Sequence, residues 1–382
     1  MKKHYYLGLA AKRKGAFKQL FTHGSWRDLV ALEMYLQGRY DGEAMLCKNG
    51  RSALALALKG YFNKGDAVII NGFTCYAVYE AVKAAGLTPV FADISREDLN
   101  FNVETLEDVF QEETEDNPKL SHATSRTTTN PVGIVIQNTF GNPVDIVAIE
   151  KFAKKHNLIV IEDLAHCVGV KYKDGREVGT VGDATVLSFG KDKSIDTTSG
   201  GAVVFRMLRK NGVKTPKKAP KLSDYLRDRW YPMFATMCRG LSYVHLSGVL
   251  MSGLMAIHFV ERSADNRLDL TRRPAKFEAK LALEQIKKLG RRNELPLRKY
   301  KLVRDRAVVL ELLRAGGFYF DGLWYEKPVS PERYYKRVHF PENECPVAVE
   351  ISEKIINFPN YYTKSELVEA YRIAEEYSDE RQ

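Results

Sequence analysis

Short apolar runs alternate with amphipathic segments between about residues 26 and 205 of this chain. The apolar runs are rich in β-branched residues and almost free of polar interruptions, which is typical of strands covered on both faces. Segments with helical spacing separate them, so the pattern predicts βαβ units and a mostly parallel sheet. The predicted strands are 66–71, 88–93, 132–138, 157–163, 184–189 and 201–205, and helices are predicted at 52–61, 77–86 and 145–156.

The pattern changes after residue 206. A basic stretch with prolines leads into 241–260, a run that contains no charged residue. A long, highly charged helix is predicted over 276–317, followed by short strand-like runs and a final helix at 365–377. We therefore expect a basic N-terminal arm (1–25), a large domain (26–215), an inserted apolar and basic segment (216–270), and a bridging helix with a smaller α/β domain (271–382).

Length and composition limit the classes of function. A chain of 382 residues can bury one large core and a smaller one, and its formal charge of +10 favours anionic partners. Nucleotides, phosphorylated small molecules and acidic membrane surfaces all qualify. The basic residues are spread along the chain without a nucleic-acid-binding motif, so nucleic acid is not an expected partner. The polar stretch 111–130 is predicted to be a surface excursion.

Cysteine usage and the N-terminus predict a cytoplasmic protein. The five cysteines are scattered and never form a CxxC pair, so neither a disulfide framework nor a metal site is expected. The N-terminal residues are basic but lack the apolar stretch of a secretory signal.

Polar side chains follow three of the predicted strands. Asp163 ends the strand at 157–163 and is followed by His166. Ser188 lies near the end of the next strand and is followed by Lys193, and Asn138 ends the strand at 132–138. Because ligands bind beyond the carboxyl ends of parallel strands, we expect these residues to converge at one edge of the sheet.

This set of groups suits pyridoxal phosphate. The cofactor needs a lysine amine that forms an imine, a carboxylate that keeps the pyridine nitrogen protonated, and groups that hold a phosphate. Gly50 permits a close backbone approach, and the amides of Arg51 and Ser52 would face the phosphate from the start of a helix. The Arg51 side chain either meets substrate phosphates or lies on the helix surface.

Several motifs resemble the DegT-like (DegT/DnrJ) family of sugar-nucleotide aminotransferases. They include NGRSALALAL, IEDLAHCVGVKY, VGDATVLSFGKDK and INFPNYYTKSEL, and the resemblance spans about residues 26–375. By this match, Asp163 partners the pyridine nitrogen, His166 lies near the cofactor hydroxyl, Ser188 binds the phosphate, and Lys193 holds the cofactor.

The resemblance implies an aspartate-aminotransferase-like fold of type I, with a large domain and a smaller C-terminal α/β domain. It also implies a homodimer that transfers an amino group from an amino acid, glutamate in the family, to a nucleotide-linked keto sugar. The products of such enzymes enter polysaccharide, glycolipid or amino-sugar biosynthesis.

The chain departs from the family pattern at several positions. Thr198 and Ser199 stand where the family has glycine and glutamate, and Asn138 replaces a histidine near the cofactor. Cys75, followed by Tyr76, stands where the family has the aromatic residue that stacks on the cofactor ring. Which residue stacks on the ring is therefore open.

Three alternatives remain open at this level. Lys191 competes with Lys193 as the attachment lysine. The same scaffold also suits a pyridoxal-phosphate-dependent sugar dehydratase or a non-catalytic, membrane-associated binding protein. Residues 241–260 form either a helical pair in a dimer interface or a hairpin on the membrane surface, and the nearby basic residues favour the membrane surface.

Overall fold

The computed structural model describes residues 18–110, 130–191, 193–242, 247–256, 265–289, 299–318, 323–358 and 364–378. Most of the predicted N-terminal arm and all but the last residue of the predicted surface excursion lie outside these ranges.

A seven-stranded sheet forms the centre of the molecule, in the order β1-β8-β7-β6-β5-β2-β4. The six predicted strands are confirmed, with five of them parallel and β8 antiparallel to β7. The seventh strand, β1, pairs antiparallel with β8 at the sheet edge and was not predicted. The bounds are β1 Glu43–Cys47, β2 Ala67–Asn71, β4 Thr88–Ala92, β5 Gly133–Ile136, β6 Ile159–Asp163, β7 Ala184–Ser188 and β8 Gly201–Phe205.

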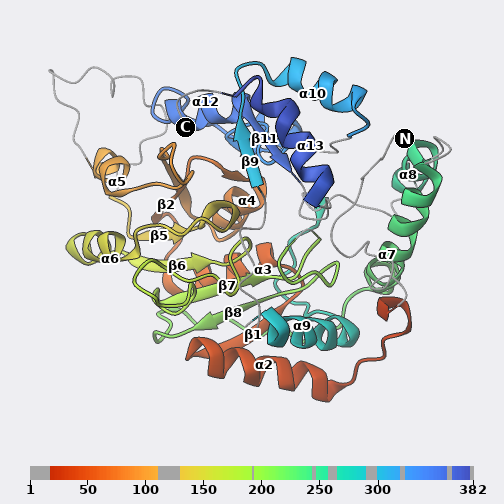
Figure 1. The fold of residues 1–382 in the computed structure, drawn as a ribbon. Coiled ribbons are helices and arrows are strands. Elements are labelled where there is room, and N and C mark those ends of the chain that lie inside the picture. The colour runs from red at the N-terminus through yellow and green to blue at the C-terminus, as the bar shows by residue number, and fades with distance from the viewer. Residues whose placement is uncertain are drawn as a thin grey trace, which may run out of the picture.

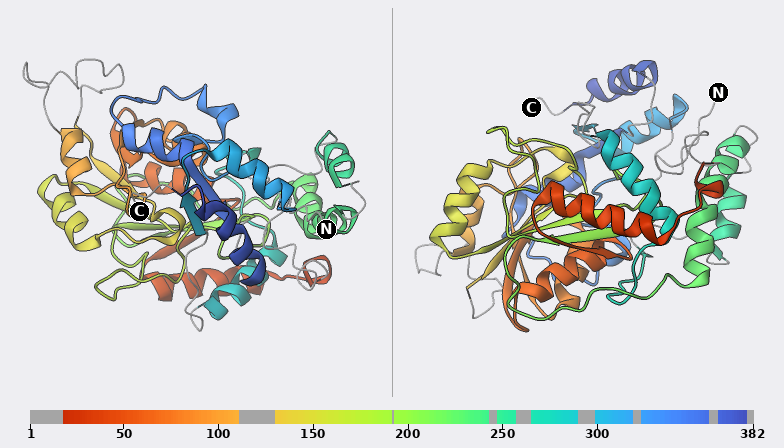
Figure 2. Two further views of the ribbon diagram at one scale, coloured as in Figure 1. Left: turned by 45° about the horizontal axis from the view of Figure 1, so that its top comes forward. Right: turned by 90° about the horizontal axis from the view of Figure 1, so that it is seen from below.

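Helices cover both faces of the sheet (Figures 1 and 2). One core cluster packs α3 (Gly50–Tyr61) and α4 (Tyr76–Ala84) on the first face. A second cluster packs α2, α5, α6 and α9 on the other. Their bounds are Trp26–Tyr40, Val103–Phe110, Ile146–Lys155 and Lys276–Leu289. The continuous apolar character of the strands follows from this double coverage.

The prediction of one long helix over 276–317 is wrong. α9 ends at Leu289, β9 covers Lys299–Leu302, and α10 covers Arg306–Ala315. β9 pairs antiparallel with β11 (Ile355–Phe358), a strand more than fifty residues away in sequence. This strand pairing overrides the helical preference of residues 299–302.

The C-terminal part has its own small core and is tied to the large sheet. α10, β11 and α13 (Lys364–Glu375) bury residues such as Val309, Phe358 and Ala370. α12 (Pro346–Lys354) instead packs into the core cluster of α3 and α4. A parallel pair of short strands, β3 (Thr74–Cys75) and β10 (Val329–Ser330), joins this part to the loop after β2, and α11 (Glu332–Tyr335) follows β10.

Two helices form the inserted segment. α7 (Leu222–Ser242) packs on α8 (Ser247–Ala256), and together they lie at the side of the molecule opposite α5 and α6 (Figure 1). The apolar run 241–260 falls on the end of α7 and on α8, and residues 243–246 and 257–260 lie outside the described ranges. Within the described chain, no helix combines the length and the apolar character that a bilayer crossing requires.

Candidate active site

Alternation along β6 and β7 places Asp163 and Ser188 on the same face of the sheet. Ile161 of β6 and Val186 of β7 belong to the core beneath α3, and Asp163 and Ser188 follow them by two residues. β6 and β7 are parallel neighbours, with Asp163 opposite Val186. Both polar side chains therefore emerge at the strand ends beside the N-terminus of α3.

The N-terminus of α3 lies unusually close to Ser188. A Cβ atom at Gly50 would be 2.6 Å from the Cβ atom of Ser188 and 2.8 Å from its hydroxyl oxygen. A Cβ atom at Gly201 would be 2.6 Å from the carbonyl carbon of Asn49. Glycine is thus required at positions 50 and 201 for the start of α3 to approach β7 and β8 this closely. The close approach brings the N-terminus of α3 next to the Ser188 hydroxyl.

The first turn of α3 is held by protein partners. Asn49 caps the helix by accepting a hydrogen bond from the Ser52 amide at 2.8 Å. The Ser52 hydroxyl accepts from the Asp269 amide at 3.0 Å. Arg51, which is buried, donates to the carboxylate of Glu80 on α4. The Arg51 side chain therefore does not lie on the surface, and the phosphate contacts of Arg51 and Ser52 stay predictions.

Asp163 is a buried carboxyl group close to a lysine. Its Oδ1 atom accepts a hydrogen bond from the Ala165 amide at 2.9 Å. Burial raises the pKa of the Asp163 carboxyl, whereas the Ala165 amide and the positive charge of Lys193 lower it. Because Asp163 is buried, water screens its carboxylate poorly. A protonated pyridine nitrogen next to Asp163 would therefore be strongly attracted to the carboxylate.

His166 is fixed through both ring nitrogens. The Phe140 amide donates to Nδ1 at 3.2 Å, and Nε2 lies 3.3 Å from the hydroxyl of Tyr325. Because Nδ1 accepts, the proton of the neutral imidazole is on Nε2. Trp324 stacks on the same imidazole, with ring centroids 5.4 Å apart.

The Lys193 side chain lies next to Trp324. Its Nζ atom is 4.6 Å from the ring centroid of Trp324. Trp324 and Tyr325 come from the C-terminal part of the chain and were not among the predicted site residues. The only sequence signal for them is a pair of adjacent aromatic residues before Pro328.

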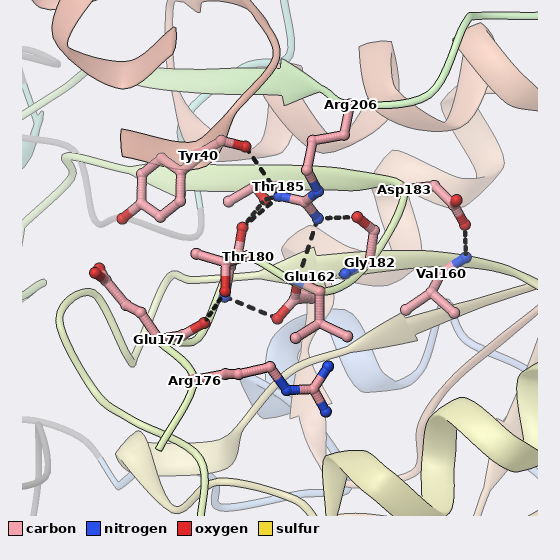
Figure 3. A network of polar contacts seen from close by, with 12 residues as sticks. Tyr40, Val160, Glu162, Arg176, Glu177, Thr180, Gly182, Asp183, Thr185 and Arg206 are labelled. Carbon is pink, nitrogen blue, oxygen red and sulfur yellow. Dashed lines mark hydrogen bonds and ion pairs between the residues drawn. The ribbon is translucent and has the colours of Figure 1, made fainter. Parts of the chain in front are cut away.

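Glu162, which precedes Asp163 on β6, points to the opposite face of the sheet. Its buried carboxylate lies at the centre of a polar network with Arg206, which also donates to the Gly179 and Gly182 carbonyls (Figure 3). The donors to Glu162 are Tyr172 Oη (2.6 Å), the amides of Gly179 (2.7 Å), Val181 (2.9 Å) and Gly182 (2.7 Å), and Arg206 Nη2 (3.3 Å). This network anchors the loop between β6 and β7 and so fixes the end of β6.

Three further predicted residues make contacts within the protein. Asn138 is buried with a left-handed backbone, and its side chain accepts from the Val144 amide at 2.9 Å. Cys75 caps α4, and Tyr76 stacks on Tyr334 at 4.5 Å. Their roles toward a cofactor stay predictions.

Lys191 points to a different environment from Lys193. Its Nζ atom lies 3.8 Å from the ring centroid of Tyr231 on α7. Two buried carboxyl groups, Asp228 and Glu278, lie in this region. Burial raises the pKa of Asp228 to about 6, against the opposing effect of Lys191. Lys191 is thus part of a buried charged cluster beneath α7.

The residues at the strand ends fit pyridoxal phosphate. The donor set contains an amine on Lys193, a buried carboxyl on Asp163, and a helix N-terminus that meets the Ser188 hydroxyl through a glycine. A dianionic phosphate is stabilised by a helix N-terminus and hydroxyl donors, and a cationic pyridine is stabilised by a carboxylate. These residues would hold the phosphate at Gly50 and Ser188 and the ring nitrogen at Asp163.

One stretch of the chain matches a known protein family. Residues 31–210 match the model of the DegT/DnrJ/EryC1/StrS aminotransferase family. Over this range, the chain is similar to that family. The match contains Gly50, Asp163, Ser188 and Lys193, so the family resemblance expected from the sequence is confirmed.

The DegT/DnrJ relatives match only part of this chain in sequence. GDP-perosamine synthase from Escherichia coli O157:H7 is 36% identical over 162 residues, which are 42% of this chain and 40% of that protein. The chain thus spans about two fifths of the length of the curated relatives it matches.

Solved structures extend the likeness in fold to nearly the whole chain. An aminotransferase of this family from Brucella abortus has a TM-score of 0.65 and 19% identity, covering 98% of this chain and 99% of that one. A GDP-4-keto-6-deoxymannose-3-dehydratase with bound GDP-perosamine has a TM-score of 0.63 and 15% identity, covering 97% and 99%. The expected fold, a large α/β domain with a mostly parallel sheet of the aminotransferase type, is confirmed.

Proposed function

We propose that this protein is a pyridoxal-phosphate-dependent aminotransferase that moves an amino group from an amino acid to a nucleotide-linked keto sugar. One observation carries the proposal: Lys193, Asp163 and the Gly50–Ser188 contact meet at one edge of the sheet. The family match over residues 31–210 supports it.

Pyridoxal phosphate supplies an electron sink that stabilises negative charge at the carbon next to the amino group. Lys193 would hold the cofactor through its amine, and the same amine would take a proton from that carbon and return one to it. Asp163 would keep the ring nitrogen protonated, because a buried carboxylate favours a neighbouring cation. His166, held by Phe140 and Tyr325, would lie near the cofactor hydroxyl, as the family resemblance implies.

We infer the substrate class from the relatives and from charge. The E. coli relative is named a GDP-perosamine synthase, which fits a nucleotide-linked sugar as the acceptor for this chain too. The formal charge of +10 favours an anionic substrate. Glutamate is the proposed donor, from the family resemblance, and the proposed role is in polysaccharide, glycolipid or amino-sugar biosynthesis.

A dehydratase is the second candidate, because a structural neighbour is named a sugar 3-dehydratase. Both reactions use the same cofactor, so cofactor binding alone cannot separate them. Lys193 favours the aminotransferase, since it supplies the amine that attaches the cofactor.

The test is an absorbance titration of the purified protein with pyridoxal phosphate, before and after glutamate, in the wild type and in Lys193→Ala. We expect an imine band that glutamate removes and that the variant lacks. Borohydride reduction followed by peptide mapping should place the cofactor on Lys193. Mapping to Lys191 would overturn this site assignment.

The acceptor is tested in the second half-reaction. Protein loaded with amino groups by glutamate is mixed with a GDP-linked 4-keto-6-deoxy sugar, and the product is analysed by mass spectrometry. An aminated sugar supports the aminotransferase. A deoxygenated sugar without added nitrogen would favour the dehydratase, and an unchanged cofactor spectrum with glutamate would count against both.

We also propose a cytoplasmic homodimer that touches the membrane surface. The dimer follows from the family resemblance, and analytical ultracentrifugation tests it. The membrane contact is motivated by exposed apolar residues on α7 and α8, among them Leu222 and Val249. Lys217 and Lys218, shortly before α7, add the positive charge that anionic lipids attract.

A further inference from the structure

Trp324 lies at the site although it is more than one hundred residues from Lys193 in sequence. Its ring is 4.6 Å from the Lys193 amine and 5.4 Å from the His166 ring, at an interplanar angle of 24° to the imidazole. The side chain is half-buried. A single indole from the C-terminal part thus faces the amine and the histidine of the large domain.

The backbone of Trp324 is held by a buried carboxamide. Asn357, on β11, is 1% exposed. Its Oδ1 atom accepts from the Trp324 amide at 2.6 Å, and its Nδ2 atom donates to the Trp324 carbonyl. The backbone N–H and C=O groups of Trp324 are therefore both bonded to the Asn357 side chain, which fixes the backbone from which the indole projects.

The residue that follows Trp324 is anchored to the large domain. Tyr325 is 4% exposed, and its hydroxyl lies 3.3 Å from Nε2 of His166. Its ring packs edge-on against Phe73 at 5.2 Å. A few residues later, β10 pairs with β3. These contacts tie the chain on the far side of Trp324 to the site.

The physical consequence concerns the Lys193 amine. A lysine has a flexible four-carbon stem, so its amine samples many positions unless something holds it. The face of an indole attracts an ammonium group within about 6 Å of its centre. The Trp324 face meets this condition and covers one side of the Lys193 amine.

We propose that Trp324 is a positioning residue for the Lys193 amine, and that Asn357 keeps Trp324 in place for this task. The inference rests on the proposed function, because it takes Lys193 as the reacting amine. The match to the family model covers residues 31–210 and therefore contains neither Trp324 nor Asn357.

The first test uses the protein without cofactor, so that it does not depend on the proposed reaction. Each lysine is labelled with an amine-acylating reagent, and the labelling rate at Lys193 is followed by peptide mass spectrometry. In Trp324→Leu, we expect Lys193 to react faster by roughly three- to tenfold, the range that cation–π energies imply. Trp324→Phe keeps an aromatic face and should stay closer to the wild type.

A matched control and a second variant complete the labelling test. Trp26 is 58% exposed and carries a different cation, Arg273, over its ring at 3.8 Å. Trp26→Leu should leave the Lys193 rate unchanged. Asn357→Ala should raise it in the same direction as Trp324→Leu. An unchanged Lys193 rate in folded Trp324→Leu would overturn the proposal.

A spectroscopic readout separates this inference from the proposed function. Pyridoxal phosphate should quench the tryptophan fluorescence of the wild type and of Trp26→Phe, but much less that of Trp324→Phe. Equal quenching in all three proteins would count against a cofactor site beside Trp324. Absence of an imine band would instead refute the proposed function and leave the labelling result unaffected.

Discussion

Gly50 shows how one missing side chain shapes the site. Replacing it with alanine would place a methyl group 2.6 Å from the Cβ atom of Ser188, where no flexible group can move aside. We expect Gly50→Ala to destabilise the protein by roughly 1–3 kcal/mol, the usual cost of overpacking. Urea denaturation measures this, and a weaker affinity for pyridoxal phosphate should accompany it.

Gly38, on the exposed side of α2, is the matched control. A Cβ atom there meets nothing within 4 Å. Gly38→Ala should be neutral or should stabilise the protein by about 0.4–1 kcal/mol, because alanine limits the unfolded chain. If both alanine variants behave alike, the close approach of Gly50 to Ser188 has no energetic importance.

The sequence predicted the site residues that follow the strands, and missed those that tertiary packing delivers. Asp163, Ser188 and Lys193 follow apolar runs, and the structure places them at the expected sheet edge. Trp324 was missed because its position depends on the pairing of β10 with β3. No periodicity near residue 324 carries this information.

At the scale of elements, the loop between β6 and β7 depends on Glu162. Its carboxylate accepts from three backbone amides and faces Arg206. We expect Glu162→Gln to lower the free energy of unfolding by roughly 3 kcal/mol, because Arg206 and the amides lose a buried charged partner. Asp174→Asn changes an exposed ion pair with Arg176 and should have little effect, as measured by urea denaturation.

The junction of α7 and α9 predicts a dependence of stability on pH. Burial raises the pKa of Asp228 to about 6, from an ordinary value of 3.8. Between pH 3.8 and about 6, the Asp228 carboxyl is protonated in the folded state but already ionised in the unfolded state. The contribution of Asp228 to the free energy of unfolding is therefore lost as the pH rises through about 6. Titratable and charged neighbours that face it are Lys48, Lys191, Asp224, Arg227 and Glu278.

The measurement compares urea midpoints at pH 5 and pH 7.5 in the wild type and in Asp228→Asn. We expect the wild type to lose more stability than the variant over this interval, because asparagine does not titrate. An equal loss in both proteins would show that Asp228 does not contribute to the dependence.

Helical and strand elements differed in how well the sequence predicted them. The strands of the parallel core were predicted almost to their bounds, because burial on both faces makes them continuously apolar. One helix was predicted over 276–317 because its residues favour helices. Lys299–Leu302 instead forms a strand, because it pairs with β11. β1 is short and lies at the edge, where the pairing with β8 decides its state.

At the scale of the whole molecule, the site combines residues from two parts of the chain that are far apart in sequence, and Trp324 and Tyr325 pack on the core cluster of α3 and α4. The large sheet supplies the groups suited to the cofactor, and the C-terminal part supplies the aromatic residues over Lys193 and His166. The binding of a ligand between them should therefore stabilise both parts together.

The last prediction concerns α7 and α8, which lie at one side of the molecule (Figures 1 and 2). Val249 on α8 is 72% exposed, and Val147 on α6 is 41% exposed at the opposite side. If α8 rests on lipid, burying Val249 contributes apolar binding energy, and Val249→Asp should weaken binding to anionic vesicles by roughly tenfold. Val147→Asp adds the same charge and should leave vesicle binding almost unchanged.

Vesicle flotation at low salt, without detergent, measures this effect. Binding that disappears with rising salt but ignores Val249→Asp would mean that the basic residues alone attract the vesicles, since apolar contact is insensitive to screening. No flotation of the wild type at low salt would refute the membrane contact and leave the dimer interface as the reading for α7 and α8. In that case Val249→Asp should instead shift the ultracentrifugation profile toward the monomer.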